Sequence, residues 1–208
     1  MAKTVSSKRW LDEHHSDEYV ARAKKDGYRS RATYKLIELQ EKDKLFKQGM
    51  TVVDLGAAPG GWSQILTRYV GGNGQVFALD ILDMPPLADV TFIQGDFTED
   101  SVYQQLCDLT SGKTIDWVIS DMAPNLSGNR GTDQAQSIYL CELALDFALQ
   151  ALTKGGGFIA KLFQGEGSDA FVAIVKEHFS KVVIRKPKAS RPRSREVYIV
   201  AFNFKGSL

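Results

Sequence analysis

The sequence is poor in residues that bind metals or form disulfide bridges. Its 208 residues include two cysteines and three histidines. Cys107 and Cys141 lie far apart among apolar or helical neighbours, and the sequence shows no metal-ligand spacing of Cys and His. We therefore expect two reduced, buried thiols and no metal site.

Long apolar runs are also missing. Lys3, Lys8 and Arg9 are followed by no such run, which argues against a signal peptide and a membrane span. We expect a soluble, cytoplasmic and monomeric protein. A content of 43% hydrophobic and 25% charged residues, without internal repeats, suits one compact α/β domain over residues 1–208.

Charge is distributed unevenly, although the formal net charge is only +1. Residues 1–35 contain nine Lys or Arg against five Asp or Glu, and residues 181–195 contain seven against none, which leaves about −10 on the remainder. A single charge run is often just a solvated surface, but two basic segments at opposite ends favour a polyanionic partner. We interpret residues 1–35 as a basic extension with a helix, and residues 36–208 as the body.

Apolar segments rich in Val, Ile and Phe alternate with helical patterns. Five segments are predicted to be buried parallel strands: Met50–Leu55, Gln75–Asp80, Val90–Gln94, Ile115–Ser120 and Gly157–Phe163. Four helices are predicted: Gly60–Val70, Asp100–Leu109, Gln134–Leu152 and Ser168–Phe179, the third of them stopped by the glycines at 155–157. This alternation indicates an α/β doubly wound sheet with helices on both faces.

The C-terminal part breaks the alternation. The strand-like segments Lys181–Arg185 and Val197–Phe204 are separated by about a dozen residues rich in Pro, Arg and Ser, where no helix fits. A parallel return would need a crossover helix, so we expect these two strands to pair antiparallel at the sheet edge. The result is a Rossmann-like, seven-stranded mixed sheet with its last strand antiparallel, which is the methyltransferase variant of the nucleotide-binding fold.

A glycine-rich loop follows the first predicted strand. The run from Asp54 to Trp62 reads DLGAAPGGW and leads into a helix, with small residues where the backbone must turn sharply and let a ligand approach. Taken alone, such a loop suits NAD, FAD or S-adenosylmethionine.

Three acids narrow this choice. Asp80, Asp96 and Asp121 each lie at the carboxyl end of a predicted strand, where open α/β sheets bind ligands. One such Asp is more often a helix cap or a loop residue, but three at consecutive strand ends favour a site for hydroxyl and amino groups rather than for a pyrophosphate. We therefore expect S-adenosylmethionine. Its expected contacts are Gly56, Pro59, Gly60 and Trp62 at the amino-acid end, Asp80 at the ribose and Asp96 at the adenine.

A lysine stands inside the fifth predicted strand. Unless it reaches solvent near the strand end, Lys161 would be costly there without partners. Asp121 ends the adjacent strand, Glu196 opens the last one, and Lys35 lies on an N-terminal helix that could cover the same edge. Methyl transfer to a ribose 2′-hydroxyl requires removal of a proton, and a lysine can favour the alkoxide as a positive charge or act as a base.

The chain resembles the FtsJ/RrmJ family of ribosomal RNA large-subunit methyltransferase E proteins nearly from end to end. The segments that carry the resemblance are Ser30–Lys35, Val53–Ser63, Gly95–Phe97, Ser120–Asn125, Lys161–Gly167 and Ser190–Val200. The Lys-Asp-Lys-Glu catalytic tetrad of the family matches Lys35, Asp121, Lys161 and Glu196.

This resemblance implies that Lys161 accepts the proton, assisted by Lys35, while Asp121 and Glu196 orient the lysines and Asp121 also touches the cofactor. It implies a substrate as well: a uridine of 23S rRNA in the nearly assembled large (50S) subunit. The basic segments agree with an RNA partner. Tyr28, Tyr34 and Trp10 interleave with basic residues, although such aromatics are more often core residues than stacking platforms.

Other functions stay open at this stage. A relative with the same tetrad could act on transfer RNA or on a messenger RNA cap. A non-catalytic RNA-binding or ribosome assembly factor would have no need of a buried lysine such as Lys161. A nicotinamide oxidoreductase is disfavoured, because a second mononucleotide-binding half is missing.

Overall fold

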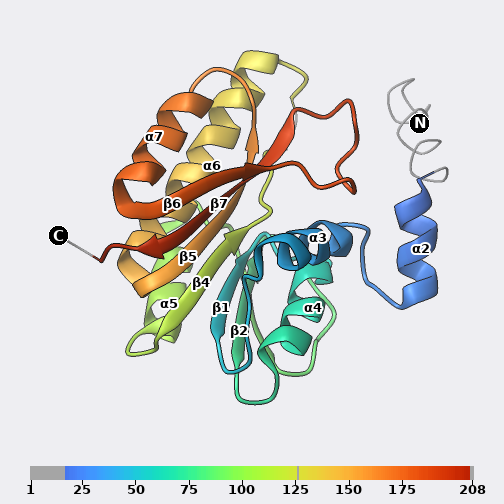
Figure 1. Cartoon of the computed structure of the whole chain (residues 1–208), viewed down its shortest axis with the longest axis vertical. Helices are drawn as coiled ribbons and strands as arrows, with labels where there is room; N and C mark the ends of the chain where they lie inside the picture. The colour runs from blue at the N-terminus through green and yellow to red at the C-terminus, as the bar shows by residue number, and fades with distance from the viewer. Residues whose placement is uncertain (1–16, 126, 207–208) are drawn as a thin grey trace.

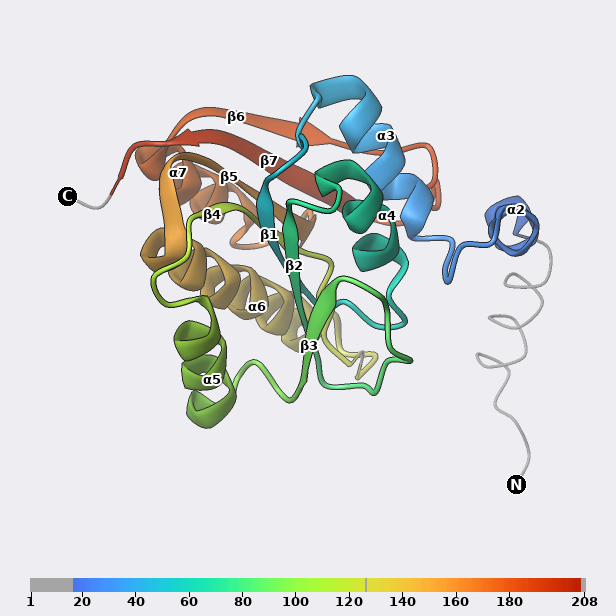
Figure 2. The same cartoon turned by 90° about the horizontal axis from the view of Figure 1, so that it is seen from below.

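The computed structural model describes residues 17–125 and 127–206, which form one mixed sheet with helices on both faces (Figures 1 and 2). The strands are β1 Thr51–Leu55, β2 Gln75–Asp80, β3 Val90–Gln94, β4 Ile115–Ser120, β5 Leu152–Phe163, β6 Phe179–Arg185 and β7 Glu196–Phe204. The helices are α2 Glu18–Asp26, α3 Thr33–Asp43, α4 Gly61–Val70, α5 Asp100–Thr110, α6 Arg130–Ala151 and α7 Ser168–His178. Each described helix is too short or too polar to cross a bilayer.

The sheet order is β3-β2-β1-β4-β5-β7-β6. β7 pairs antiparallel with both β5 and β6, and the other neighbouring strands pair parallel. The predicted seven-stranded sheet with an antiparallel last strand is confirmed. β7 does not lie at the edge itself, because it fills the position between β5 and β6.

Each face of the sheet has its own hydrophobic core. Helices α5, α6 and α7 cover one face, and α3 and α4 cover the other (Figure 2). Side chains alternate between the two cores along each strand, as a pleated strand requires. In β1, for example, Val53 and Leu55 pack with α6, whereas Val52 packs with α3 and α4.

The structure differs from the sequence prediction around the glycines at 155–157. These glycines do not stop a helix, because α6 ends at Ala151 and Leu152 already has extended backbone angles and opens β5. The register of β5 against β4 shifts between the Ile115–Leu152 and Trp117–Gly157 pairs, so the extra residues form an irregularity opposite β4. A Cβ at Gly157 would come within 2.4 Å of the Trp117 ring, which explains the glycine there.

The start of α6 also differs from the prediction. The helix begins at Arg130, four residues before the predicted Gln134. Asn129 is its N-cap, because the side-chain oxygen accepts hydrogen bonds from the backbone N–H groups of Gly131 and Thr132, at 3.0 and 3.3 Å. The sequence prediction overlooked this cap.

The N-terminal part contains two described helices rather than one. Helix α2 lies to one side of the sheet (Figures 1 and 2), and α3 contributes Leu36 and Leu39 to the core beside α4. The predicted division at residue 35/36 therefore falls inside α3. Tyr34 is buried between Tyr19 and Tyr28, so it packs α2 against α3. Trp10, Lys3, Lys8 and Arg9 lie outside the described residues.

Candidate active site

Strand alternation brings the predicted catalytic residues to the face that α3 and α4 cover. Ile159 of β5 packs into that core, and Lys161, two residues further, points to the same side. In β7 the buried Tyr198 belongs to the same core, so Glu196 shares its side. Lys161 and Tyr198 are direct partners in the β5–β7 register.

Two ion pairs connect the four predicted residues. The Lys161 Nζ atom lies 3.1 Å from Asp121 Oδ1 and also donates to the Asp121 backbone carbonyl. The Lys35 Nζ atom, brought in by α3, lies 2.7 Å from Glu196 Oε1. Both lysine side chains are only 8% exposed. The structure thus places the Lys-Asp-Lys-Glu set in one buried cluster.

Tyr198 joins the two ion pairs into one network. Its hydroxyl donates to Asp121 Oδ1 at 2.7 Å and lies 3.5 Å from Glu196 Oε1. Burial and these two carboxylates raise the pKa of Tyr198 well above 10, so the phenol stays a donor. Sequence reasoning missed Tyr198, although its position two residues after Glu196 in a strand puts both side chains on one face.

Asp121 is ionised in this network. Burial alone would raise the pKa of its carboxyl group, but the positive charges of Lys161 and Lys35 and the hydrogen bond from Tyr198 outweigh it and lower the pKa below the usual value of 3.8. At neutral pH the Asp121 carboxylate is therefore a fixed anion, and it holds Lys161 in an ion pair.

A cavity of about 110 Å³ opens beside the network. It is lined by Ser30, Arg31, Ala32, Gly56, Ala57, Ala58, Pro59, Gly61, Trp62 and Asp121. Four of the predicted cofactor residues, Gly56, Pro59, Trp62 and Asp121, are thus brought together. The space suits several non-hydrogen atoms, since about 10–15 Å³ is enough for one water.

Gly60 and Trp62 of the glycine-rich loop have structural roles that explain their identity. Gly60 has φ +98° and lies outside the cavity, because Met84 and Arg29 cover the position of a Cβ. Trp62 is 3% exposed, donates from its indole N–H to the Ala32 carbonyl at 2.8 Å and packs 5.6 Å from the Tyr198 ring. Trp62 therefore connects the glycine-rich loop to the buried network at Tyr198.

Asp80 and Asp96 lie on neighbouring strand ends beyond the cavity. Asp80 Oδ2 accepts from the Ala58 N–H and Oδ1 from the Leu82 N–H, both at 2.8 Å. Asp96 Oδ1 accepts from the Thr98 N–H and hydroxyl, at 2.9 and 2.7 Å. Leu82, 64% exposed, follows Asp80 on the same strand exit. The two carboxylates therefore lie at neighbouring strand ends, and the exposed Leu82 lies next to Asp80 in the chain.

Asp54 is a buried acid that sequence reasoning did not single out. It is fully buried; Oδ2 accepts from the Ser63 hydroxyl at 2.6 Å, and Oδ1 has no hydrogen-bond partner. Burial, reinforced by the charges of Asp121 and Asp80, raises its pKa to about 7 despite the Ser63 hydrogen bond.

The raised pKa of Asp54 predicts a pH-dependent stability. The folded protein binds this proton more tightly than the unfolded chain, so stability falls as pH rises from about 4 to about 7 and is constant above. Asp54→Asn should lack this fall. The unfolding free energy of Asp54→Asn minus that of wild type should therefore increase as pH rises from about 4 to about 7, by at most ~4 kcal/mol. Urea unfolding between pH 4.5 and 8, with the exposed Asp83→Asn as control, measures the difference; a pH-independent difference would contradict this assignment.

The Arg-rich segment at 186–195 is held against the N-terminal helices. Glu38 of α3 accepts hydrogen bonds from the backbone N–H groups of Lys188 and Ala189, at 2.6 and 2.9 Å. Arg31 donates to the Ala189 carbonyl at 2.7 Å. At the end of β6, Arg185 forms a two-point ion pair with Asp43. The described part of the N-terminal basic segment therefore contacts the Arg-rich segment, which is distant in sequence.

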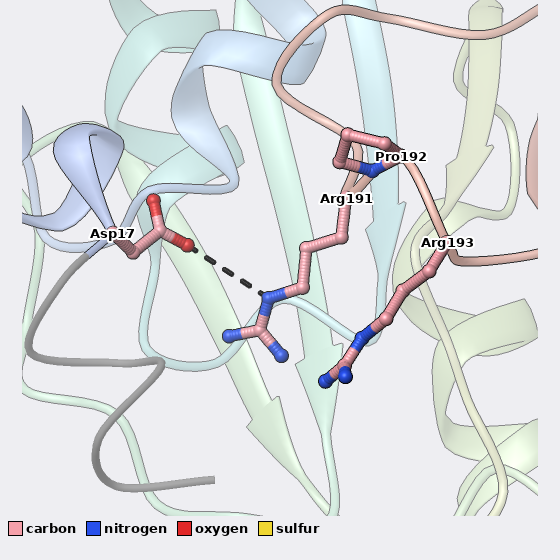
Figure 3. A pocket seen from close by; sticks show the side chains of 4 residues that line it. All are labelled: Asp17, Arg191, Pro192 and Arg193. Atoms are coloured by element: carbon pink, nitrogen blue, oxygen red, sulfur yellow. Dashed lines mark ion pairs between the residues drawn. The ribbon is translucent and has the colours of Figure 1, made fainter. Parts of the chain in front are cut away.

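A hollow of about 310 Å³ lies where this segment meets the start of α2 (Figure 3). It is lined by Asp17, Arg191, Pro192 and Arg193. The Asp17 carboxylate faces Arg191, with Oδ2 at 3.8 Å from Nε, and lies 2.8 Å from Arg31 Nε. One carboxylate thus holds arginines of both basic segments together.

Metal chemistry has no obvious centre in residues 17–125 and 127–206. They contain no group of three or more His, Cys, Asp or Glu residues that could hold an ion.

Cys107 is partly exposed, and Cys141 is buried with its thiol 3.0 Å from the Lys161 carbonyl.

Named relatives match the chain over nearly its whole length. The chain is 59% identical over 206 residues to proteins named "Ribosomal RNA large subunit methyltransferase E" from Francisella tularensis subsp. tularensis (strain WY96-3418) and Stutzerimonas stutzeri (strain A1501). Each alignment covers 99% of this chain and 100% of the relative.

Solved structures match as well. A Plasmodium falciparum protein described as a ribosomal RNA methyltransferase superposes with a TM-score of 0.76 and 32% identity, covering 86% of this chain and 100% of that one. A Clostridium thermocellum protein described as an rRNA methylase shares the fold, with a TM-score of 0.55 and 20% identity over 81% of this chain and 97% of that one. The profile of the FtsJ-like methyltransferases matches residues 28–204. The chain therefore belongs to the FtsJ-like methyltransferase family.

Proposed function

We propose that the protein transfers a methyl group from S-adenosylmethionine to the ribose 2′-hydroxyl of a uridine in 23S rRNA of the large ribosomal subunit. The observation that carries the proposal is the buried network of Lys161, Asp121, Lys35 and Glu196 beside the cavity of the glycine-rich loop. Such a network costs desolvation energy, which a catalytic role accounts for better than stability does.

The residues fit S-adenosylmethionine, which would supply an electrophilic methyl group. The cavity at Gly56, Pro59 and Trp62 would hold the amino-acid end, with Asp121 in its wall. The Asp80 and Asp96 carboxylates at the neighbouring strand ends would accept hydrogen bonds from the ribose hydroxyls and the adenine amino group.

The lysines would act on the target hydroxyl. Lys161 would first release its ammonium proton to solvent, and the free amine would then accept the 2′-hydroxyl proton, while the positive charge of Lys35 would stabilise the developing alkoxide. Asp121 fixes the Lys161 amine from two sides, through its carboxylate and its backbone carbonyl. Glu196 holds Lys35 and is itself oriented by the Ser190 hydroxyl at 2.8 Å.

The substrate assignment rests on the basic surface and on the relatives. Residues 1–35 and 181–195 supply the Lys and Arg that contact phosphates without sequence preference. The names of the relatives point to large-subunit ribosomal RNA. We assign the 23S rRNA of the 50S subunit as partner, and hence the cytoplasm as location, with the protein acting as a monomer whose catalytic body includes α3 and its Lys35.

The decisive experiment supplies labelled S-adenosylmethionine and, separately, undermethylated large subunits, free rRNA and transfer RNA. Nucleosides are then identified by mass spectrometry. Formation of 2′-O-methyluridine in the subunits is the expected result. Label in transfer RNA would keep the chemistry and overturn the substrate, and binding of the cofactor without any transfer would favour a non-catalytic assembly factor.

Asp80→Ala is expected to weaken cofactor binding about tenfold or more, since a charged hydrogen-bond acceptor contributes ~1.5–3 kcal/mol. Calorimetry with S-adenosylhomocysteine measures the dissociation constant. Asp83→Ala removes the same charge from an exposed side chain three residues away and serves as control. Equal affinities for the Asp80 variant and wild type would remove Asp80 from the site.

A further inference from the structure

Arg29 ties together two loops that lie on either side of Asp80. Its guanidinium donates to the Pro59 carbonyl at 3.3 Å, in the glycine-rich loop, and to the Pro85 and Pro86 carbonyls at 2.5 and 2.8 Å, in the loop after β2. A lysine could not reproduce this fork, because only a planar guanidinium presents several N–H groups in fixed directions.

The segment that carries Arg29 is itself fixed on α4. The Arg29 backbone N–H donates to Gln64 Oε1 at 3.0 Å, and Gln64 Nε2 donates to the Gly27 carbonyl at 2.9 Å. Helix α4 begins at the glycine-rich loop. Arg29 is therefore positioned relative to that loop by hydrogen bonds from both its backbone N–H and its guanidinium.

Gly60 shows how closely Arg29 approaches the loop. A Cβ at this position would come within 3.0 Å of Arg29 Nη1 and 2.8 Å of Met84 Sδ. The glycine therefore leaves room for a side chain from each of the two neighbouring segments. The outer side of the glycine-rich loop is closed by protein groups, while its inner side faces the cavity.

Asp80 forms a second, inner tie between the same loops through the Ala58 and Leu82 N–H groups. The proposed function assigns the Asp80 carboxylate to the ribose. Its two oxygens would then accept hydrogen bonds from both the backbone N–H groups and the ligand. Arg29 bonds only to the backbone carbonyls of Pro59, Pro85 and Pro86, so its hydrogen bonds do not use the Asp80 oxygens that the ligand would need.

We propose that Arg29, although it belongs to the basic N-terminal segment, is a positioning residue for the cofactor site: it sets the spacing of the glycine-rich loop and the loop after β2. This inference rests on the proposed function for the identity of the ligand. It separates Arg29 from the arginines that would contact RNA phosphates, because its guanidinium is committed to the two loops.

The test compares Arg29→Ala, Arg29→Lys and the control Arg68→Ala, first in binding measurements without RNA and then in methyl-transfer assays. Arg68 is an exposed guanidinium on α4 that lies 5.5 Å from the centre of the Tyr28 ring. Calorimetry with S-adenosylhomocysteine should show about tenfold weaker binding for Arg29→Ala, as the loss of one to two net hydrogen bonds implies, with an intermediate value for Arg29→Lys and wild-type affinity for Arg68→Ala. In methyl-transfer assays KM for the donor should rise while kcat at saturating donor is retained.

Hydrogen exchange gives a readout that needs no ligand. Amides in 56–60 and 81–87 should exchange faster in Arg29→Ala than in wild type or Arg68→Ala, at unchanged thermal stability. Unchanged affinity together with unchanged exchange would overturn the inference. If wild type itself bound no S-adenosylhomocysteine, the proposed function would fail, and the exchange comparison alone would still decide the role of Arg29.

Discussion

Lys161→Met is expected to lower the rate of methyl transfer by about 10²- to 10⁴-fold, the usual contribution of a positioned proton acceptor. Methionine keeps the length of the side chain and removes the amine. The Lys161 amine touches Asp121 in the resting network and lies beside the cavity wall. Single-turnover assays with saturating cofactor and undermethylated subunits measure the chemical step directly.

The controls separate chemistry from folding. Lys154→Met removes a lysine from the exposed part of the same strand and should react like wild type. Cofactor affinity in Lys161→Met should change little, because the role assigned to the amine lies in the transition state. The fold should persist, since Asp121 keeps the Tyr198 hydroxyl at 2.7 Å and the nearby charge of Lys35. A fully active Lys161→Met protein would remove the residue from the mechanism.

Asp121→Asn is expected to impair both catalysis and stability. Asparagine can still accept from Tyr198 but leaves the Lys161 charge, 8% exposed, without its counterion. Removing one partner of such a pair costs roughly 3 kcal/mol, and turnover should fall about 10²-fold or more because the lysine loses its orientation. Asp83→Asn, which changes an exposed carboxylate in the loop after β2, is the control.

The stability difference should depend on pH with a defined sign. The lowered pKa of Asp121 means that its contribution is fully present above the unfolded value near 3.9 and is lost as pH falls through the folded value. The difference between wild type and Asp121→Asn should therefore shrink below about pH 4. Chemical denaturation at pH 3 and pH 7 tests this, and a difference that widens in acid would refute the ion-pair explanation.

Much of the sheet follows from local sequence patterns. Continuous apolar runs identify strands such as β2 and β4, and the Pro- and Arg-rich segment after β6 requires an antiparallel return. The glycines at 155–157 misled the prediction, because a glycine run also suits a strand irregularity. Only the three-dimensional neighbour, Trp117, distinguishes the two.

The sequence predicts those residues of the candidate site whose type is unusual for their position. A lysine inside an apolar strand and acids at strand ends stand out in any sequence, and the structure brings Lys161, Asp121, Lys35 and Glu196 together. Tyr198 and Asp54 do not stand out in the same way, because a tyrosine is ordinary in an apolar strand and Asp54 lies inside β1 rather than after its last residue. Their importance depends on burial and on partners from other elements.

The position of β7 has a consequence for biosynthesis. This strand is synthesised after the other six, yet it is inserted between β5 and β6 and carries both Glu196 and Tyr198. A nascent chain that lacks β7 leaves β5 and β6 without the strand that pairs with both, and it lacks the side chains that contact Lys35 and Asp121. The buried network can therefore form only after the last strand has been synthesised and has made its long-range pairing with β5.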